Sequence, residues 1–274
     1  ISGSGVLDAL LLENTIEYNG AGQTVILPNG SGQGYYHLIL SGSGTKTLPG
    51  SDLTIGGDFT LSGTASATAL DTLSIGGSLT VGPGTSLNLG SFGHTVGVDL
   101  SNSGTLSASS ASIDFDGSVQ QSITSSAGLN LANLIISNAA DTVVLGSSTN
   151  CSLSGDLTIA SSAVFNLGEN LLSAVSGSIP GTGTILTQST SATPVPAGLT
   201  WGGSFVFNGS ATQTMVGGTY NNLSIDNTSG VDAASKLTVN GIIDLPVANP
   251  SATRGVLDMG SDTLLLAPSA TNTG

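Results

Sequence analysis

Three stretches of this chain are variants of one pattern, and this long repeat constrains the fold more than any single residue does. The copies run from Ile16 to Val25 (IEYNGAGQTV), from Ile113 to Ile123 (IDFDGSVQQSI) and from Phe205 to Met215 (FVFNGSATQTM). An aromatic or apolar segment follows each copy at a similar distance, beginning at Tyr35, Leu131 and Tyr220. A chain made of copies owes its architecture to the way the copies stack. The pattern therefore indicates a structural object more than an active site.

A shorter repeat lies within the long one. LTIGGDFTL from Leu53 recurs as LSIGGSLTV from Leu73, a shift of 20 residues, and related strings begin at Leu153 and Leu237. Each has alternating apolar residues on both sides of a Gly or Asn-Gly turn. Because side chains alternate across a strand, the inward and outward positions can be assigned. We expect inward Leu53, Ile55, Phe59 and Leu61, and outward Thr54 and Thr60.

A shift of about 20 residues is typical of one coil of a β-solenoid, whose coils stack in parallel about 4.8 Å apart. Helix-forming residues are scarce and Gly is abundant, with 40 glycines and only 7% charged residues. We therefore expect an all-β, parallel, right-handed β-solenoid of about a dozen rungs and a rod about 60 Å long. A period of roughly 90 residues also fits tandem immunoglobulin-like β-sandwiches, the alternative fold. Against it, the 20-residue repeat has no place in a sandwich, and Trp201 is not repeated as a core marker.

The predicted organisation is one continuous solenoid over residues 1–274. It comprises three divergent long repeats, approximately 15–111, 112–203 and 204–274. Residues 1–14 echo the C-terminal module, because GVLD followed by a Leu triplet occurs near both ends. The stretch from Gly177 to Gly203 holds three prolines and is expected to be a loop, since proline removes ladder hydrogen bonds.

Charge excludes several classes of function. The formal net charge is −14, with Lys46, Lys236 and Arg254 as the three cations. Nucleic acid is not an expected partner, because phosphate binding needs a basic patch. Membrane insertion is not expected either, because no apolar run is long enough to span a bilayer. Cys151 is the one cysteine and is expected to be a small buried residue.

Three longer strings resemble the repeat regions of large secreted and cell-surface proteins of Bacteroidota-type bacteria. They are YYHLILSGSGTKTL from Tyr35, YNNLSIDNTSGVDAASKLTVNGIIDL from Tyr220 and VLDMGSDTLLL from Val256. The resemblance covers nearly the whole chain, and the second unit is the most divergent. It implies a β-helical stalk or adhesin that is exported to the cell surface. No sorting domain for the type IX route is visible.

The sequence offers little chemistry for catalysis, so we predict no enzyme, no cofactor and no metal. His37 and His94 have no metal-ligand spacing. A polysaccharide lyase would need cations for an anionic sugar, and this acidic chain would repel one. Asp114-Phe115-Asp116-Gly117 could suggest calcium, but it lacks the other ligands of an EF-hand loop, and outward polar residues around an inward aromatic explain it better. An ice-binding array is only weakly indicated, by the outward threonines Thr54, Thr60, Thr80, Thr158 and Thr238.

The function that we expect is structural and extracellular: a subunit of a self-assembling surface filament, or a segment of a long adhesin fibre. The partner is a second copy, stacked end to end, or the remainder of a longer surface chain. The predicted assembly edges are Val6, Leu7, Leu10 and Leu12 at one end, and Val256, Leu257, Leu264 and Leu265 at the other. The alternative is a glycan-binding adhesin module, for which the predicted contacts are Tyr35, Tyr36 and Trp201.

Overall fold

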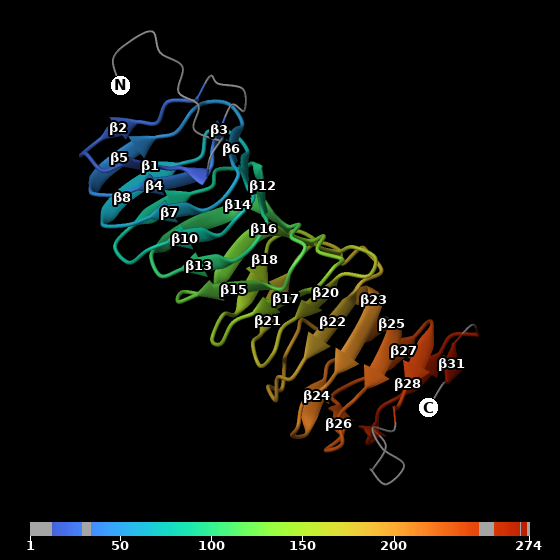
Figure 1. The fold of residues 1–274 in the computed structure, drawn as a ribbon. Helices are drawn as coiled ribbons and strands as arrows, with labels where there is room; N and C mark the ends of the chain where they lie inside the picture. Colours follow the sequence, from blue (N-terminus) through green and yellow to red (C-terminus); the bar gives the residue numbers. More distant parts are fainter. Residues whose placement is uncertain (1–12, 29–33, 247–254, 269, 273–274) are drawn as a thin grey trace.

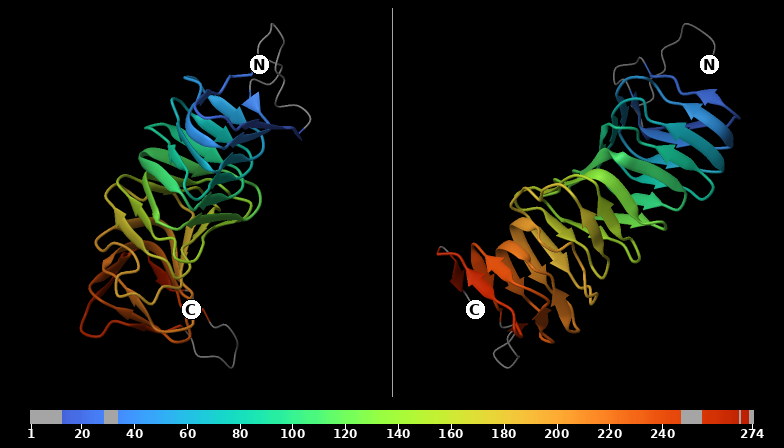
Figure 2. Two further views of the ribbon diagram at one scale, coloured as in Figure 1. Left: turned by 90° about the vertical axis from the view of Figure 1, so that its left-hand side faces the viewer. Right: turned by 180° about the vertical axis from the view of Figure 1, so that it is seen from behind.

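The computed structural model describes residues 13–28, 34–246, 255–268 and 270–272. They form an all-β parallel solenoid of about 11 coils with about 21 residues each, and every strand pairing is parallel. Figures 1 and 2 show the coils stacked into an elongated rod, with β1 and β31 at opposite ends. The solenoid prediction is confirmed, and the alternative of immunoglobulin-like sandwiches is wrong.

One long sheet of 15 strands follows the rod from end to end, and we call its surface face 1. Its main path consists of β1 (Thr15–Tyr18), β4 (His37–Leu40), β7 (Phe59–Leu61), β10 (Leu79–Val81), β13 (Leu100–Asn102), β15 (Gln121–Ser125), β17 (Thr142–Leu145), β20 (Val164–Asn166), β22 (Thr184–Thr187), β23 (Thr200–Phe207), β25 (Gly218–Ile225), β27 (Leu237–Val239) and β30 (Leu264–Leu266). Strands β28 (Ile242–Asp244) and β31 (Thr271–Asn272) join it through β25.

A second sheet of 13 strands makes the other two sides of the early coils. Face 2 holds β2 (Gln23–Thr24), β5 (Ser43–Thr47), β8 (Thr64–Thr68), β11 (Ser86–Asn88), β18 (Cys151–Leu153) and β21 (Leu172–Val175). Face 3 holds β3 (Gly34–Tyr35), β6 (Leu53–Ile55), β9 (Leu73–Ile75), β12 (Gly93–Val96) and β19 (Leu157–Ile159). The long strands β14 (Thr105–Phe115) and β16 (Leu129–Ile136) run across both faces and join them. A third sheet, of β24 (Gln213–Met215), β26 (Val231–Ala233) and β29 (Leu257–Asp258), closes the last coils.

Strict alternation builds the core. Leu53, Ile55, Phe59 and Leu61 are all buried, whereas Thr54 is exposed, so the predicted inward and outward positions are confirmed. Parallel register then stacks inward residues of successive coils on one another. Leu38, Phe59 and Leu79 are register partners on face 1, for example, and none is more than 1% exposed. The interior is therefore one continuous apolar column, whose burial provides the main driving force for folding.

Glycine is required where the chain turns between faces 1 and 2. Gly42 has φ of 69° and Gly63 has φ of 67°, a left-handed conformation that other residues rarely adopt. The two glycines also stack closely, because a Cβ on Gly63 would lie 2.5 Å from the carbonyl oxygen of Gly42. The corner is thus tight along the rod axis as well as within the coil.

The stretch from Gly177 to Gly203 is not one loop, so that prediction needs correction. It contains β22, which pairs with β20 and β23 in the middle of face 1. Proline is compatible with the ladder here because it keeps its acceptor. The carbonyl of Pro180 accepts from the Ile159 amide, and the carbonyl of Pro194 accepts from the Leu172 amide. The irregular parts are the segments 177–183, apart from a bridge at Gly181, and 188–199.

Candidate functional site

The long repeat encodes a buried glutamine at a corner of the solenoid. The side chain of Gln121 is fully buried between faces 3 and 1. Its Oε1 accepts from the Gly117 amide at 3.0 Å, within its own coil. Its Nε2 donates to the carbonyls of Val96 and Val98 in the preceding coil, at 2.7 and 2.8 Å. In the following coil, the buried Asn138 donates to the same Oε1 at 3.1 Å. One side chain therefore connects three successive coils.

The third copy of the repeat has the same arrangement around Gln213. Its Oε1 accepts from the Gly209 amide at 2.8 Å and from Asn227 Nδ2 at 2.9 Å. Its Nε2 donates to the carbonyls of Thr187 and Ser189 at 3.0 and 3.3 Å. A buried amide without hydrogen-bond partners destabilises the fold, and these partners are in place only when the coils are stacked correctly. Each glutamine therefore fixes the stacking of its coils.

In the first copy, a lysine stands where the other copies have asparagine. Gln23 Oε1 accepts from the Gly20 amide at 2.6 Å, and Lys46 Nζ of the next coil lies 3.4 Å from it. Lys46 is fully buried and also donates to the carbonyls of Gly20 and Ser43. We refer to Gln23, Gln121 and Gln213 with their partners as the glutamine clamps. All three glutamines are present in the repeat pattern, but their role between neighbouring coils was not predicted from it.

The three clamps lie at two kinds of corner: Gln23 and Gln213 each follow a strand on face 1, whereas Gln121 is the first residue of one. Gln23 follows β1 at the corner between faces 1 and 2, and Gln121 follows the part of β14 on face 3. Gln213 follows β23 on face 1. The repeated pattern therefore specifies a strand, a corner and a strand, without fixing the face on which they occur.

The aromatic residues predicted to contact glycans are not brought together. Tyr35 and Trp201 are buried, at 0% and 2% exposure, so the prediction that they form a surface patch is wrong. Trp201 packs edge-on against Phe205 at 4.9 Å and stacks on Tyr220 at 6.3 Å between ring centroids. Tyr36 is the accessible one, and the negative charge of Glu13 raises its pKa. In these strands, aromatic rings occupy the inward positions because they fill the core.

The N-terminal coil has polar groups in its interior. The hydroxyls of Tyr18 and Tyr35 are 2.9 Å apart, Tyr35 also donates to the carbonyl of Ile26, and the Ile26 amide donates to Tyr18. Burial raises the pKa of Tyr35, so its hydroxyl stays protonated as a donor. With the Lys46 contacts, the polar groups inside this end are hydrogen-bonded, while the side chain of Ile26 beside them is 45% exposed.

The C-terminal coil has exposed apolar side chains instead. Leu264 and Leu266 are register partners of Leu237 and Val239, which are fully buried. Leu264 is only partly buried and Leu266 is 52% exposed, because no described strand pairs with the outer edge of β30. Of the other predicted edge residues, Val256 and Leu265 are exposed and Leu257 is partly buried, whereas Val6, Leu7, Leu10 and Leu12 lie outside the described residues.

The residues considered for chemistry have structural partners. His94 is buried and donates from Nε2 to the carbonyl of Leu89, while its Nδ1 accepts from the Leu73 amide. His37 Nδ1 accepts from the Asp58 amide at 2.9 Å. Cys151 is buried, as predicted, and burial raises its pKa to about 12. Asp114 accepts from the Ser137 hydroxyl, and burial raises the pKa of its carboxyl.

Neither a metal site nor a membrane-spanning helix occurs in the described part of the chain. Among the described residues, no group of three His, Cys, Asp or Glu side chains is placed to hold a metal ion. The same part of the chain contains no helix that is long and apolar enough to cross a membrane. The outward threonines are divided between faces: Thr60 and Thr80 are register partners on face 1, whereas Thr54 and Thr158 lie on face 3.

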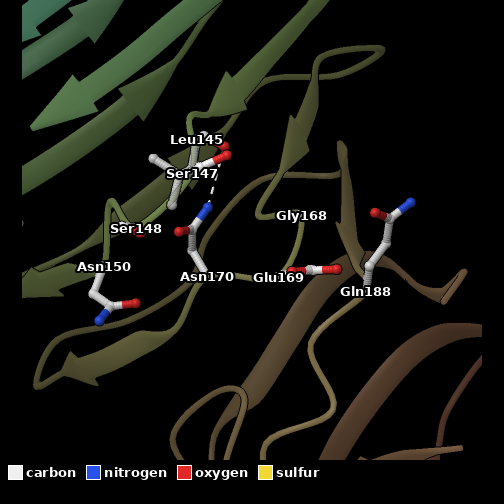
Figure 3. Close-up of a pocket in the computed structure, with 8 residues that line it drawn as sticks. All are labelled: Leu145, Ser147, Ser148, Asn150, Gly168, Glu169, Asn170 and Gln188. Carbon is white, nitrogen blue, oxygen red and sulfur yellow. Dashed lines mark hydrogen bonds between the residues drawn. The ribbon is translucent and has the colours of Figure 1, made fainter. Parts of the chain in front are cut away.

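A polar groove follows the corner between faces 1 and 2. It has a volume of about 510 Å³ and is lined by Leu145, Ser147, Ser148, Asn150, Gly168, Glu169, Asn170 and Gln188. Figure 3 shows Asn170 in the middle of this set, with a hydrogen bond to the backbone of Leu145. A smaller hollow of about 210 Å³ continues it past Glu169 and Gln188 to Thr190, Asn208, Gly209, Ser210 and Ala211. We call the two together the corner groove.

Comparison of this chain with models of protein families, with curated proteins and with solved structures found no match.

Proposed function

We propose that this chain is a structural extracellular protein, a stiff β-solenoid rod that stacks end to end in a surface filament. The observation that carries the proposal is the exposure of inward-facing residues in the last coil. Leu266 occupies the position that Val239 fills one coil earlier, yet half of its surface is open. Covering it with a further parallel coil would bury apolar area and pair the free edge of β30.

A second copy of the chain is the occupant that fits this edge. Because all strands are parallel, the two ends of the rod present unlike edges. An N-terminal strand such as β1 can therefore add to a C-terminal edge in the same direction as every other pairing. Such a contact joins two different surfaces and does not close, so it generates filaments. The glutamine clamps support a mechanical role, since they resist the separation of neighbouring coils.

The extracellular location rests on the resemblance to bacterial surface repeats and is part of the proposal. The same resemblance supports the other form of the rod, a segment of a long adhesin fibre in which the next coil belongs to the same chain. The two forms predict different behaviour for the isolated protein.

Electron microscopy and sedimentation of the purified chain test the proposal. Wild type should form fibres, and Leu266→Glu should abolish them, because a carboxylate would be placed in the joint. Val119→Glu is the matched control, since Val119 is 54% exposed but lies at a corner in the middle of the rod. Isolated rods of the wild type would overturn the filament and favour the fibre segment. Fibres that persist in Leu266→Glu would exclude this edge.

A further inference from the structure

We propose that the corner groove is a binding site for a neutral oligosaccharide. The inference uses side chains remote from the end contacts, so it does not rest on the proposed stacking. Turns of four successive coils line the groove: 145–150, 168–170, 188–190 and 208–211. At about 4.8 Å per coil, they span about 14 Å along the rod, which suits a short chain of sugars better than one sugar.

The groove has a rigid floor made by Asn170, a residue that is only 6% exposed. Its Oδ1 accepts from the Thr149 amide at 2.9 Å, and its Nδ2 donates to the carbonyls of Leu145, Gly146 and Leu167 at 2.9 to 3.2 Å. Both ends of the Asn170 amide are thus engaged with the protein, so this residue shapes the groove and other residues are left to contact the ligand. A preformed floor lowers the cost of ordering the site when a ligand binds.

The walls, in contrast, carry polar groups that are exposed and have no side-chain partner among the described residues. These are the hydroxyls of Ser147 and Ser148, the Glu169 carboxylate and the Gln188 amide. Asn150 uses its Oδ1 for the Leu171 amide, which leaves its Nδ2 as a donor. Hydroxyls, amides and a carboxylate can together both donate to and accept from sugar hydroxyls.

The second hollow holds an unsatisfied acceptor. Asn208 lines it, and the Oδ1 of Asn208 is buried without a hydrogen-bond partner in the described structure. A buried acceptor without a hydrogen bond is unfavourable, because it has lost its contact with water and gained no partner. Rotation of this amide toward the groove would let a ligand hydroxyl satisfy it. The groove therefore lacks a hydrogen-bond donor for Asn208, and the hydroxyl of a polyhydroxyl ligand is such a donor.

The lining also excludes other ligand classes. It contains no cation, and the chain has a net charge of −14, so phosphates, sulfates and uronates are disfavoured. The apolar side chains of the lining are those of Leu145 and Ala211, and they offer too little apolar surface for a lipid. Glu169 is its single carboxylate, and a calcium ion takes six to eight oxygen ligands.

Calorimetric titration of the full chain tests the site. The probes are neutral tetrasaccharides of β-1,4-glucose, β-1,4-mannose, α-1,4-glucose and β-1,3-glucose, with tetragalacturonate as the anionic comparison. At least one neutral probe should bind, and Glu169→Ala and Gln188→Ala should each weaken it about tenfold. Matched controls are Asp52→Ala and Gln120→Ala, which remove an exposed acid and an exposed amide away from the groove.

Hydrogen exchange gives a second readout that needs no variant. The binding probe should slow exchange in the turns 147–150 and 208–211 of the wild type, and leave the corners of the first five coils unchanged. The proposal is overturned if none of the neutral probes binds, if tetragalacturonate binds as well as they do, or if both groove variants bind like the controls. Protection located elsewhere on the rod would overturn it too.

Discussion

The first and last coils solve the same problem in opposite ways. Every coil of a solenoid has inward residues that the next coil must cover, and an end coil lacks one neighbour. At the N-terminal end the described residues answer with polar groups, namely the paired hydroxyls of Tyr18 and Tyr35 and the buried Lys46. At the C-terminal end Leu264 and Leu266 remain aliphatic and open. Both ends therefore have a strand edge, of β1 and of β30, with which no described strand pairs. They differ in their inward groups, which are hydrogen-bonded polar groups at the N-terminal end and open aliphatic side chains at the C-terminal end.

Truncating one leucine near each end of the rod is the strongest test of this difference. Leu38→Ala removes a fully buried side chain from the second coil and should cost about 2–5 kcal/mol. Leu264→Ala makes the same chemical change at the open end and should cost less than about 1 kcal/mol in the unassembled chain, since little area is lost. Urea denaturation followed by circular dichroism measures both. Equal losses would mean that the C-terminal coil is covered in solution.

Removing a hydroxyl tests the hydrogen bonds inside the N-terminal end. Tyr35→Phe leaves the carbonyl of Ile26 and the hydroxyl of Tyr18 without their partner, which should cost about 1–3 kcal/mol. Tyr36→Phe is the control: it deletes a hydroxyl one residue away that is hydrogen-bonded to the exposed Glu13, so it should change stability much less. Hydrogen exchange of β1 and β4 reports the effect locally. If Tyr35→Phe behaves like its control, the hydroxyl pair does not stabilise this end.

Acidification should give the smallest effect and should act on the N-terminal half. Burial lowers the pKa of His94, against the opposing effect of its hydrogen bond to Leu89. Below the ordinary histidine pKa of about 6.5, the unfolded chain takes up a proton that the folded chain does not. Stability is therefore full above that pH and falls as the pH drops through it.

Thermal unfolding at pH 7.5 and pH 5.5 checks this prediction. The melting temperature of the wild type should fall more between the two values than that of His94→Gln, which cannot take up the proton. Exchange should increase in β9 and β12, beside His94, before it increases in β27 and β30. An identical pH dependence in the variant would show that another group controls the transition.

The fold was predictable from sequence because its determinants are local. Alternation within nine residues decides which side chains point inward, as at Leu53, Ile55, Phe59 and Leu61, and a 20-residue shift gives the length of the coil. The prediction of a loop at Gly177 to Gly203 was wrong because proline was judged only by its missing donor. Pro180 and Pro194 serve as acceptors, and that depends on which coil lies beside them.

The sites were harder to predict because they depend on neighbouring coils. Gln121 looks like a surface residue in the sequence, and only the carbonyls of Val96 and Val98 from the coil before it explain its burial. The corner groove joins turns about 20 residues apart, which no local pattern marks. For the buried glutamine, the available signal was that it recurs in all three copies of the long repeat, since a surface residue has no packing reason to recur.

The positions of the clamps also affect how a rod of this kind changes in length. Gln23 and Gln121 are 98 residues apart and Gln121 and Gln213 are 92 apart, so with coils of about 21 residues neither interval is a whole number of turns. A repeat unit added by copying would therefore be rotated about the rod axis relative to the copy before it. Gln23 and Gln213, however, are 190 residues apart, which is about nine coils, so the third clamp returns to the corner of the first. Successive copies would thus present their features at two corners of the rod in turn and not in a single row.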